Sequence, residues 1–280
     1  MNSGVTVRHL NQMKAQVSTV KQACPERGRR INDVLSHTSI AALRRHPQFT
    51  AAKAGDPIAA FAVVRELTRQ ERITRLASEH PGAIICPVLA IERTGINMLP
   101  LAFAKFAGSV GGLRVETEIV QINKTHHTDS DAMHRLLNRP EFDGIVIPGQ
   151  AYIVVDDVIT SGSTIQALRL FLESHGAKVV AFAALAGSFN IITGSSLEIT
   201  LTEETLHGLE TKFGIANFTQ FLRQHHIAQA PAELTNCQAR YLLSFRNLDS
   251  IRNRIAPQHS QVSIEKTRST SHRQMMLAFA

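Results

Sequence analysis

Residues 151–164 read AYIVVDDVITSGST, and this stretch decides the fold. Apolar residues run without interruption into the acidic pair Asp156 and Asp157, which is typical of a strand buried on both faces. The small residues 160–164 then precede an amphipathic stretch that predicts a helix. Because the first N–H groups of a helix lack intrahelical partners, this loop favours a phosphate. The two carboxylates lie where a ribose or a metal ion would bind.

The stretch resembles the signature with which type I phosphoribosyltransferases bind 5-phosphoribosyl 1-pyrophosphate (PRPP). That signature has four apolar residues, two acids, two apolar residues and a loop rich in Thr, Ser and Gly. The resemblance implies that Asp156 and Asp157 contact the ribose hydroxyls and approach the Mg²⁺ that accompanies PRPP. It assigns the 5′-phosphate to Thr160, Ser161, Gly162, Ser163 and Thr164. The alternative without a binding function is an ordinary strand–turn–helix with polar turn residues.

A second loop, residues 87–97 (PVLAIERTGIN), resembles the pyrophosphate loop of the ComF-like branch of this family. The resemblance gives this role to Arg93, Thr94, Gly95 and Asn97. An arginine offers several donors to phosphate oxygens, and glycine lets the backbone approach closely. A surface arginine beside a loop-breaking glycine is the competing interpretation.

Residues 123–140 resemble the segment that closes over PRPP in this family. Lys124 or Arg139 would neutralise the pyrophosphate leaving group, and solvated loop cations are the alternative. The resemblance therefore implies four catalytic residues: Asp156, Asp157, Lys124 and Arg93.

Composition bounds the remaining expectations. The formal charge of +7 and the pI of about 9.7 suit a polyanion such as PRPP, or weak nucleic-acid contact through the basic termini. A solvated basic surface explains them equally well. Three widely spaced cysteines match no metal site and favour reduced thiols, and the adjacent histidines 126–127 and 225–226 lack a ligand framework. With no apolar run of about 20 residues and no secretory pattern, we expect no membrane contact and a cytoplasmic location.

Strands that alternate with helices predict an α/β protein. With the resemblance, we expect a three-layer fold like that of type I phosphoribosyltransferases, with a mainly parallel central sheet and helical additions at both ends. The expected segments are a basic, helical extension (1–55), the core (56–190), a strand with helices (191–257) and a disordered tail (258–280).

The pattern also predicts individual elements. A helical stretch begins near residue 32, and a capped helix follows from Asp56-Pro57 to residue 78. Another helix is expected over 96–107, and a short one over 132–137. Strands are expected over 83–87, 114–122, 145–147, 178–185 and 197–202. Further helices are expected over 163–175, 203–213, 217–225 and 232–254.

The resulting prediction is a phosphoribosyltransferase that transfers the 5-phosphoribosyl group from PRPP-Mg²⁺ to a nitrogenous base. The sequence identifies neither the base nor the oligomeric state, and a homodimer is left open. The alternative is a catalytically silent PRPP- or nucleotide-binding protein of a regulatory or DNA-uptake kind, as some ComF-like relatives are.

Overall fold

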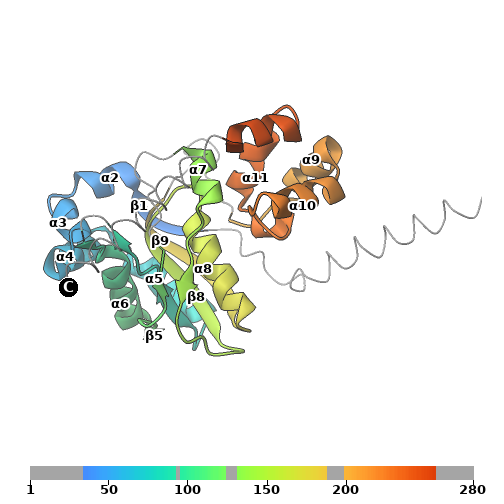
Figure 1. Ribbon diagram of the computed structural model, residues 1–280. Coiled ribbons are helices and arrows are strands. Elements are labelled where there is room, and N and C mark those ends of the chain that lie inside the picture. The colour runs from blue at the N-terminus through green and yellow to red at the C-terminus, as the bar shows by residue number, and fades with distance from the viewer. Residues whose placement is uncertain (1–33, 93–94, 124–130, 188–198, 257–280) are drawn as a thin grey trace, which may run out of the picture. The chain divides into compact units, whose positions relative to one another are not determined.

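A computed structural model describes residues 34–92, 95–123, 131–187 and 199–256. These residues belong to one compact unit, Asn32–Ala280. Within them, five parallel strands form the main sheet in the order β1-β9-β8-β2-β5 (Figure 1). The strands are β1 (Val34–Ser39), β2 (Ile84–Pro87), β5 (Arg114–Val115), β8 (Ala151–Ile159) and β9 (Lys178–Gly187). The prediction of a mainly parallel sheet is confirmed.

The central strand of this sheet is β8. It has β9 on one side and β2 on the other, and its residues 152–157 are all buried. The pairing with β2 ends where Val155 lies opposite Pro87. Asp156 and Asp157 follow directly, at the carboxyl end of the sheet, where ligands bind in open α/β folds.

Helices cover both faces of the sheet. Val63, Ile73 and Phe103 share a hydrophobic core with Ile153 and Val155 of β8. The alternation of side chains along a strand directs residues 152 and 154 to the other face, and α8 packs against β8 and β9. This gives the expected three layers. The helices are α2 (Ile40–Arg45), α3 (Phe49–Lys53), α4 (Pro57–Leu67), α5 (Gln70–Glu79), α6 (Leu99–Gly111) and α8 (Ser163–Ser174).

A second hydrophobic core belongs to a set of helices that we call the helical module. The module is defined as α7 (Ala132–Leu137) together with residues 199–256. Met133 and Leu136 of α7 are fully buried among apolar side chains of the other members. These members are α9 (Glu203–Phe213), α10 (Ile215–Gln224), the 3₁₀ turn η1 (Pro231–Glu233), α11 (Asn236–Leu243) and the helical residues 248–256.

Two expectations near the N-terminal end are wrong. Residues 34–39 form strand β1, because they pair in parallel with β9, rather than a helix. The expected helix over 57–78 is two helices, α4 and α5. The break lies at Arg69, whose backbone N–H donates to Nδ1 of His37 over 3.0 Å instead of continuing the helix. The N-cap is as predicted, since Asp56 accepts from the backbone N–H groups of Ile58 and Ala59.

The helix expected over 96–107 begins and ends later, at Leu99 and Gly111. Ile96 belongs instead to the short strand β4 (Gly95–Ile96). Gly108 lies within α6, where a Cβ would come 2.7 Å from the Val115 side chain, so glycine allows the helix to pack closely against β5. The actual stop is Gly112, which has a φ of 66°.

Four further predictions are corrected. The strand over 114–122 is interrupted, because the Glu116 carboxylate accepts from the N–H groups of Thr117 and Glu118 and forms a turn. What remains is β5 and β6 (Val120–Gln121), and β6 pairs with β7 (Phe142–Asp143). Residues 145–147 and 199–202 are not strands, and residues 197–198 lie outside the described residues. The helix over 232–254 is divided into η1, α11 and residues 248–256.

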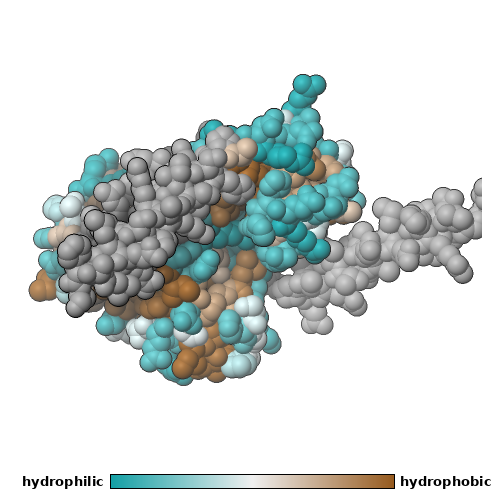
Figure 2. Space-filling model, in the orientation of Figure 1, coloured by the Kyte–Doolittle hydropathy of each residue, from teal (hydrophilic) through white to brown (hydrophobic). Residues whose placement is uncertain are grey.

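The remaining predicted elements are confirmed within a few residues: β2, α7, α8, β9, α9 and α10. On the visible face, hydrophilic groups interrupt small hydrophobic patches (Figure 2). In the part of the chain that the structure describes, no helix is long and apolar enough to cross a bilayer. The large apolar side chains that are exposed in the described residues are Ile58, Phe61, Ile96, Val120, Ile122, Ile145 and Ile147.

Folding stability should depend on pH through His37. Burial, then the nearby charges of Arg72 and Arg69, lowers the pKa of His37 from 6.5 to about 4. In the unfolded chain His37 binds a proton as the pH falls below 6.5, whereas in the folded chain it binds one only near pH 4. The free energy of unfolding therefore falls as the pH is lowered through this window. Between pH 7 and pH 5, the wild type should lose about 2 kcal/mol more free energy of unfolding than His37→Gln.

Urea denaturation at several pH values measures this difference. The matched control is His175→Gln, since His175 is exposed, and that variant should keep the wild-type pH dependence. Equal slopes for wild type and His37→Gln would contradict the assignment.

Candidate functional site

The site is built around two adjacent carboxyl groups at the carboxyl end of β8. Asp156 is 8% exposed and Asp157 is 3% exposed. The Asp157 backbone N–H donates to Oδ1 of Asp156 over 2.8 Å. Among the described residues, Oδ2 of Asp157 is buried and accepts no hydrogen bond. A buried carboxylate oxygen that accepts no hydrogen bond keeps the capacity to accept one from a hydroxyl group of a ligand.

The surroundings of Asp156 shift its protonation. Burial, followed by the Asp157 carboxylate, raises the pKa of Asp156 well above its ordinary value, and Lys53 offsets part of this effect. The protonated form of Asp156 is therefore more accessible than that of an ordinary carboxyl group, and a protonated carboxyl group can donate a hydrogen bond. Such a pair can bind both hydroxyl groups of a cis-diol.

Lys53 is a site residue that the sequence did not reveal. Its Nζ lies 3.0 Å from Oδ2 of Asp157, although the contact does not have hydrogen-bond geometry. Lys53 is the last residue of α3, in the segment expected to be a simple extension. The only signal was a single lysine among small residues before Asp56-Pro57. Such a lysine is not distinctive until the fold places it beside the acids.

The candidate phosphate loop leads directly into helix α8. Gly162, with a φ of 73°, precedes the first residue of α8, and no side chain caps the helix. A left-handed residue here is natural only for glycine. Ser161 and Ser163 place their hydroxyl oxygens 3.4 Å apart at the same turn. The first N–H groups of α8 therefore meet two hydroxyl groups, which is a suitable cradle for an anion.

The second loop is a small hairpin of β3 (Ile91–Glu92) and β4. Arg93 and Thr94 lie outside the described residues, and Gly95 is the first residue of β4. Asn97 is buried, and its Oδ1 accepts from the backbone N–H of Leu99 over 3.2 Å at the start of α6. The Met98 N–H donates to the Ala52 carbonyl over 3.3 Å, so the end of this loop lies beside the end of α3 that carries Lys53.

The third predicted segment is only partly described. Lys124 lies outside the described residues, whereas Arg139 is well placed in the structure. The guanidinium of Arg139 contacts Glu233 of the helical module, with Nη2 3.2 Å from the backbone oxygen and Nη1 4.0 Å from Oε2. Burial lowers the pKa of Arg139, and Glu233 opposes this effect. In this structure Arg139 serves a contact with the helical module.

The acidic pair fits Mg²⁺ only as part of a larger ligand set. In the described part of the chain, no three His, Cys, Asp or Glu residues are grouped to hold a metal ion. Carboxylate oxygens are ligands that Mg²⁺ prefers, and Mg²⁺ commonly completes its shell with water and phosphate oxygens. Among the described residues, Cys86 and Cys237 are free cysteines, and burial raises the pKa of the Cys86 thiol.

The ion pair of Lys53 and Asp157 should couple the two residues energetically. Lys53→Met should lower the free energy of unfolding by about 1–2 kcal/mol, because the Asp157 carboxylate then stays buried without its counterion. In a double-mutant cycle with Asp157→Asn, the coupling energy should be about 1 kcal/mol. The same cycle on the exposed pair Arg75 and Glu79 is the control and should give nearly zero. Equal coupling in both pairs would contradict the assignment.

Curated relatives cover the chain to different extents. Protein TraN of Escherichia coli is 35% identical over 227 residues, which is 80% of this chain and 49% of that protein. An adenine phosphoribosyltransferase of Roseiflexus sp. (strain RS-1) is 30% identical over 122 residues, 41% of this chain and 66% of that enzyme. The chain thus spans about half the length of the Escherichia coli protein that it matches.

Solved structures align only in part. An adenine phosphoribosyltransferase of Saccharomyces cerevisiae is 14% identical, with a TM-score of 0.31 over 53% of this chain and 74% of that chain. The UMP synthase of Leishmania donovani is 15% identical, with a TM-score of 0.29 over 67% of this chain and 33% of that chain.

The family is indicated by the domain match and by the sheet together. Residues 58–190 of the chain match a phosphoribosyl transferase domain, and they hold the central strand, the acidic pair and the loop described above.

Proposed function

We propose that the chain binds PRPP with Mg²⁺ and transfers the 5-phosphoribosyl group to a nitrogenous base, with release of pyrophosphate. One observation carries the proposal: a buried acidic pair at the end of β8 is followed, after a short loop, by a helix start that no side chain caps. The pair suits a ribose diol, and the helix start suits a 5′-phosphate. PRPP carries both groups at the matching ends of one sugar.

In this proposal, the described residues act mainly by positioning. Asp156 and Asp157 form hydrogen bonds with the two ribose hydroxyl groups. The residues from Thr160 to Thr164 hold the 5′-phosphate. Fixing the sugar at both ends presents C1 to the incoming base and lowers the entropic part of the barrier.

The reaction breaks the bond from C1 to the pyrophosphate oxygen and forms a bond from C1 to a base nitrogen. The electron pair of the broken bond leaves with pyrophosphate, and the base nitrogen loses its proton. Mg²⁺, bound with PRPP, would stabilise charge on the departing pyrophosphate. Arg93, Gly95 and Lys124 remain the proposed residues for that end of the substrate, and the location is proposed to be cytoplasmic.

A second candidate is a PRPP-binding regulator without transferase activity, of the ComF-like kind. The observation that favours it is the ion pair of Lys53 with Asp157, which engages a carboxylate that would otherwise hold ribose. Weak nucleic-acid contact and a homodimer also remain proposals.

Pyrophosphate release separates these candidates. Wild-type protein with PRPP and Mg²⁺ should release pyrophosphate with at least one of adenine, guanine, hypoxanthine, uracil and orotate. Gly162→Val should reduce kcat/KM by about 100-fold or more, because a branched side chain strains the backbone at the phosphate loop.

The matched control is Gly149→Val. Gly149 has a similar φ of 77° but lies in the turn before β8, with open space around its Cα. This variant should keep its activity. PRPP binding without release for any base would favour the regulator, and equal activity in the two variants would contradict the loop assignment.

A further inference from the structure

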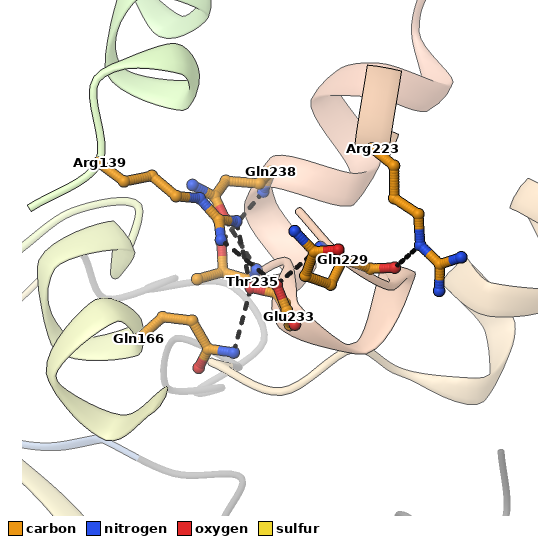
Figure 3. Close-up of polar contacts among 7 residues, drawn as sticks. All are labelled: Arg139, Gln166, Arg223, Gln229, Glu233, Thr235 and Gln238. Atoms are coloured by element: carbon orange, nitrogen blue, oxygen red, sulfur yellow. Dashed lines mark hydrogen bonds and ion pairs between the residues drawn. The ribbon is translucent and has the colours of Figure 1, made fainter. Parts of the chain in front are cut away.

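The helical module contacts helix α8 and the segment after α7 through a short stretch around η1. Figure 3 shows the side chains that meet there. The backbone oxygen of Glu233 accepts from Nη2 of Arg139 over 3.2 Å and from Nε2 of Gln166 over 3.3 Å. The module therefore offers one carbonyl group to two different segments of the phosphoribosyltransferase domain.

The stretch that carries this carbonyl is itself fixed. Oε2 of Glu233 accepts from the backbone N–H of Gln229 over 2.9 Å. Two residues further on, Thr235 and Gln238 form a capping box that starts α11. Because both flanks are held by local hydrogen bonds, the Glu233 carbonyl is a rigid acceptor.

Gln166 lies next to the candidate phosphate loop. Its own backbone N–H donates to the Gly162 carbonyl over 2.9 Å, which is the first helical bond of α8. Its side chain is almost fully buried, at 2% exposure, and Oε1 has no hydrogen-bond partner among the described residues. The bond from Nε2 to Glu233 is therefore the one side-chain hydrogen bond that this buried amide makes among the described residues, and it joins the start of α8 to the helical module.

The second donor also belongs to a held segment. The Arg139 carbonyl accepts from Nδ2 of Asn123 over 2.7 Å, and Oδ1 of Asn123 accepts from the Glu141 N–H over 2.8 Å. Arg139 is thus fixed to the strand segment on one side and to Glu233 on the other. Of the two donors to the Glu233 carbonyl, Gln166 lies on α8, the helix that follows the candidate phosphate loop.

We propose that Gln166 is a positioning residue for the phosphate loop. By donating to the Glu233 carbonyl, it fixes the first turn of α8 against the helical module. The N–H groups of Ser163, Thr164 and Ile165 then keep the orientation that a 5′-phosphate requires. This inference rests on the proposed function and adds a role for the helical module, which lies outside the matched domain except for α7.

Titration calorimetry with two partial ligands tests the role. Gln166→Met keeps the length of the side chain and removes the donor. It should weaken binding of ribose 5-phosphate by about tenfold and leave binding of pyrophosphate with Mg²⁺ within about twofold. A purely structural role would change both affinities together.

The matched control is Gln150→Met. Gln150 makes the same kind of bond, from Nε2 to the Gly82 carbonyl over 2.8 Å, at the opposite end of β8. This variant should bind both ligands as the wild type does. Gln166→Asn, which keeps an amide that is too short to reach Glu233, should behave like Gln166→Met.

Three results would overturn the inference while leaving the proposed function intact. The first is wild-type affinity for ribose 5-phosphate in Gln166→Met. The second is an equal loss for both ligands. The third is failure of both Gln166 variants to fold, measured by circular dichroism, because the bond would then serve the fold alone. A wild type that binds neither ribose 5-phosphate nor PRPP would instead contradict the proposed function itself.

Discussion

Two adjacent carboxyl groups buried at the end of a central strand constrain the rest of this structure. Burial favours neutral carboxyl groups, and two that lie side by side cannot both be charged without compensation. The chain meets this constraint in two ways: Asp156 has a raised pKa, and Asp157 has the ammonium group of Lys53 3.0 Å away. One acceptor oxygen still lacks a hydrogen bond among the described residues. An arrangement of this kind costs stability, and a ligand with hydroxyl groups would recover part of that cost.

The site combines parts from well-separated regions of the sequence. Strand β8 provides the acids, α3 provides the counterion, and the start of α8 provides the uncapped N–H groups. The helical module then contacts α8 and the segment that ends in Arg139 through the Glu233 carbonyl. Its core includes α7, which lies within residues 58–190 of the matched domain. The module is therefore interlocked with the domain instead of being a separate addition, which gives it a physical route to influence the phosphate loop.

Much of the fold was predictable because it follows from local patterns. The apolar run before Asp156 predicted the central strand, and Gly162 with its neighbours predicted the helix start. The errors have tertiary causes. Residues 34–39 become a strand only because β9 offers an edge, and the helix break at Arg69 depends on a hydrogen bond to His37, which is 32 positions away. Lys53 and Gln166 were not identified for the same reason: each gains its role from a partner that is distant in sequence.

The central claim is that Asp157 holds the ribose of PRPP. Calorimetric titration of PRPP with Mg²⁺ into wild type, Asp157→Asn and the exposed control Asp143→Asn tests it most directly. The account predicts binding by the wild type and the control, and an affinity at least about tenfold lower for Asp157→Asn, because a hydrogen bond to a charged group is lost. Equal PRPP affinity for wild type and Asp157→Asn, or no binding by the wild type, would contradict it.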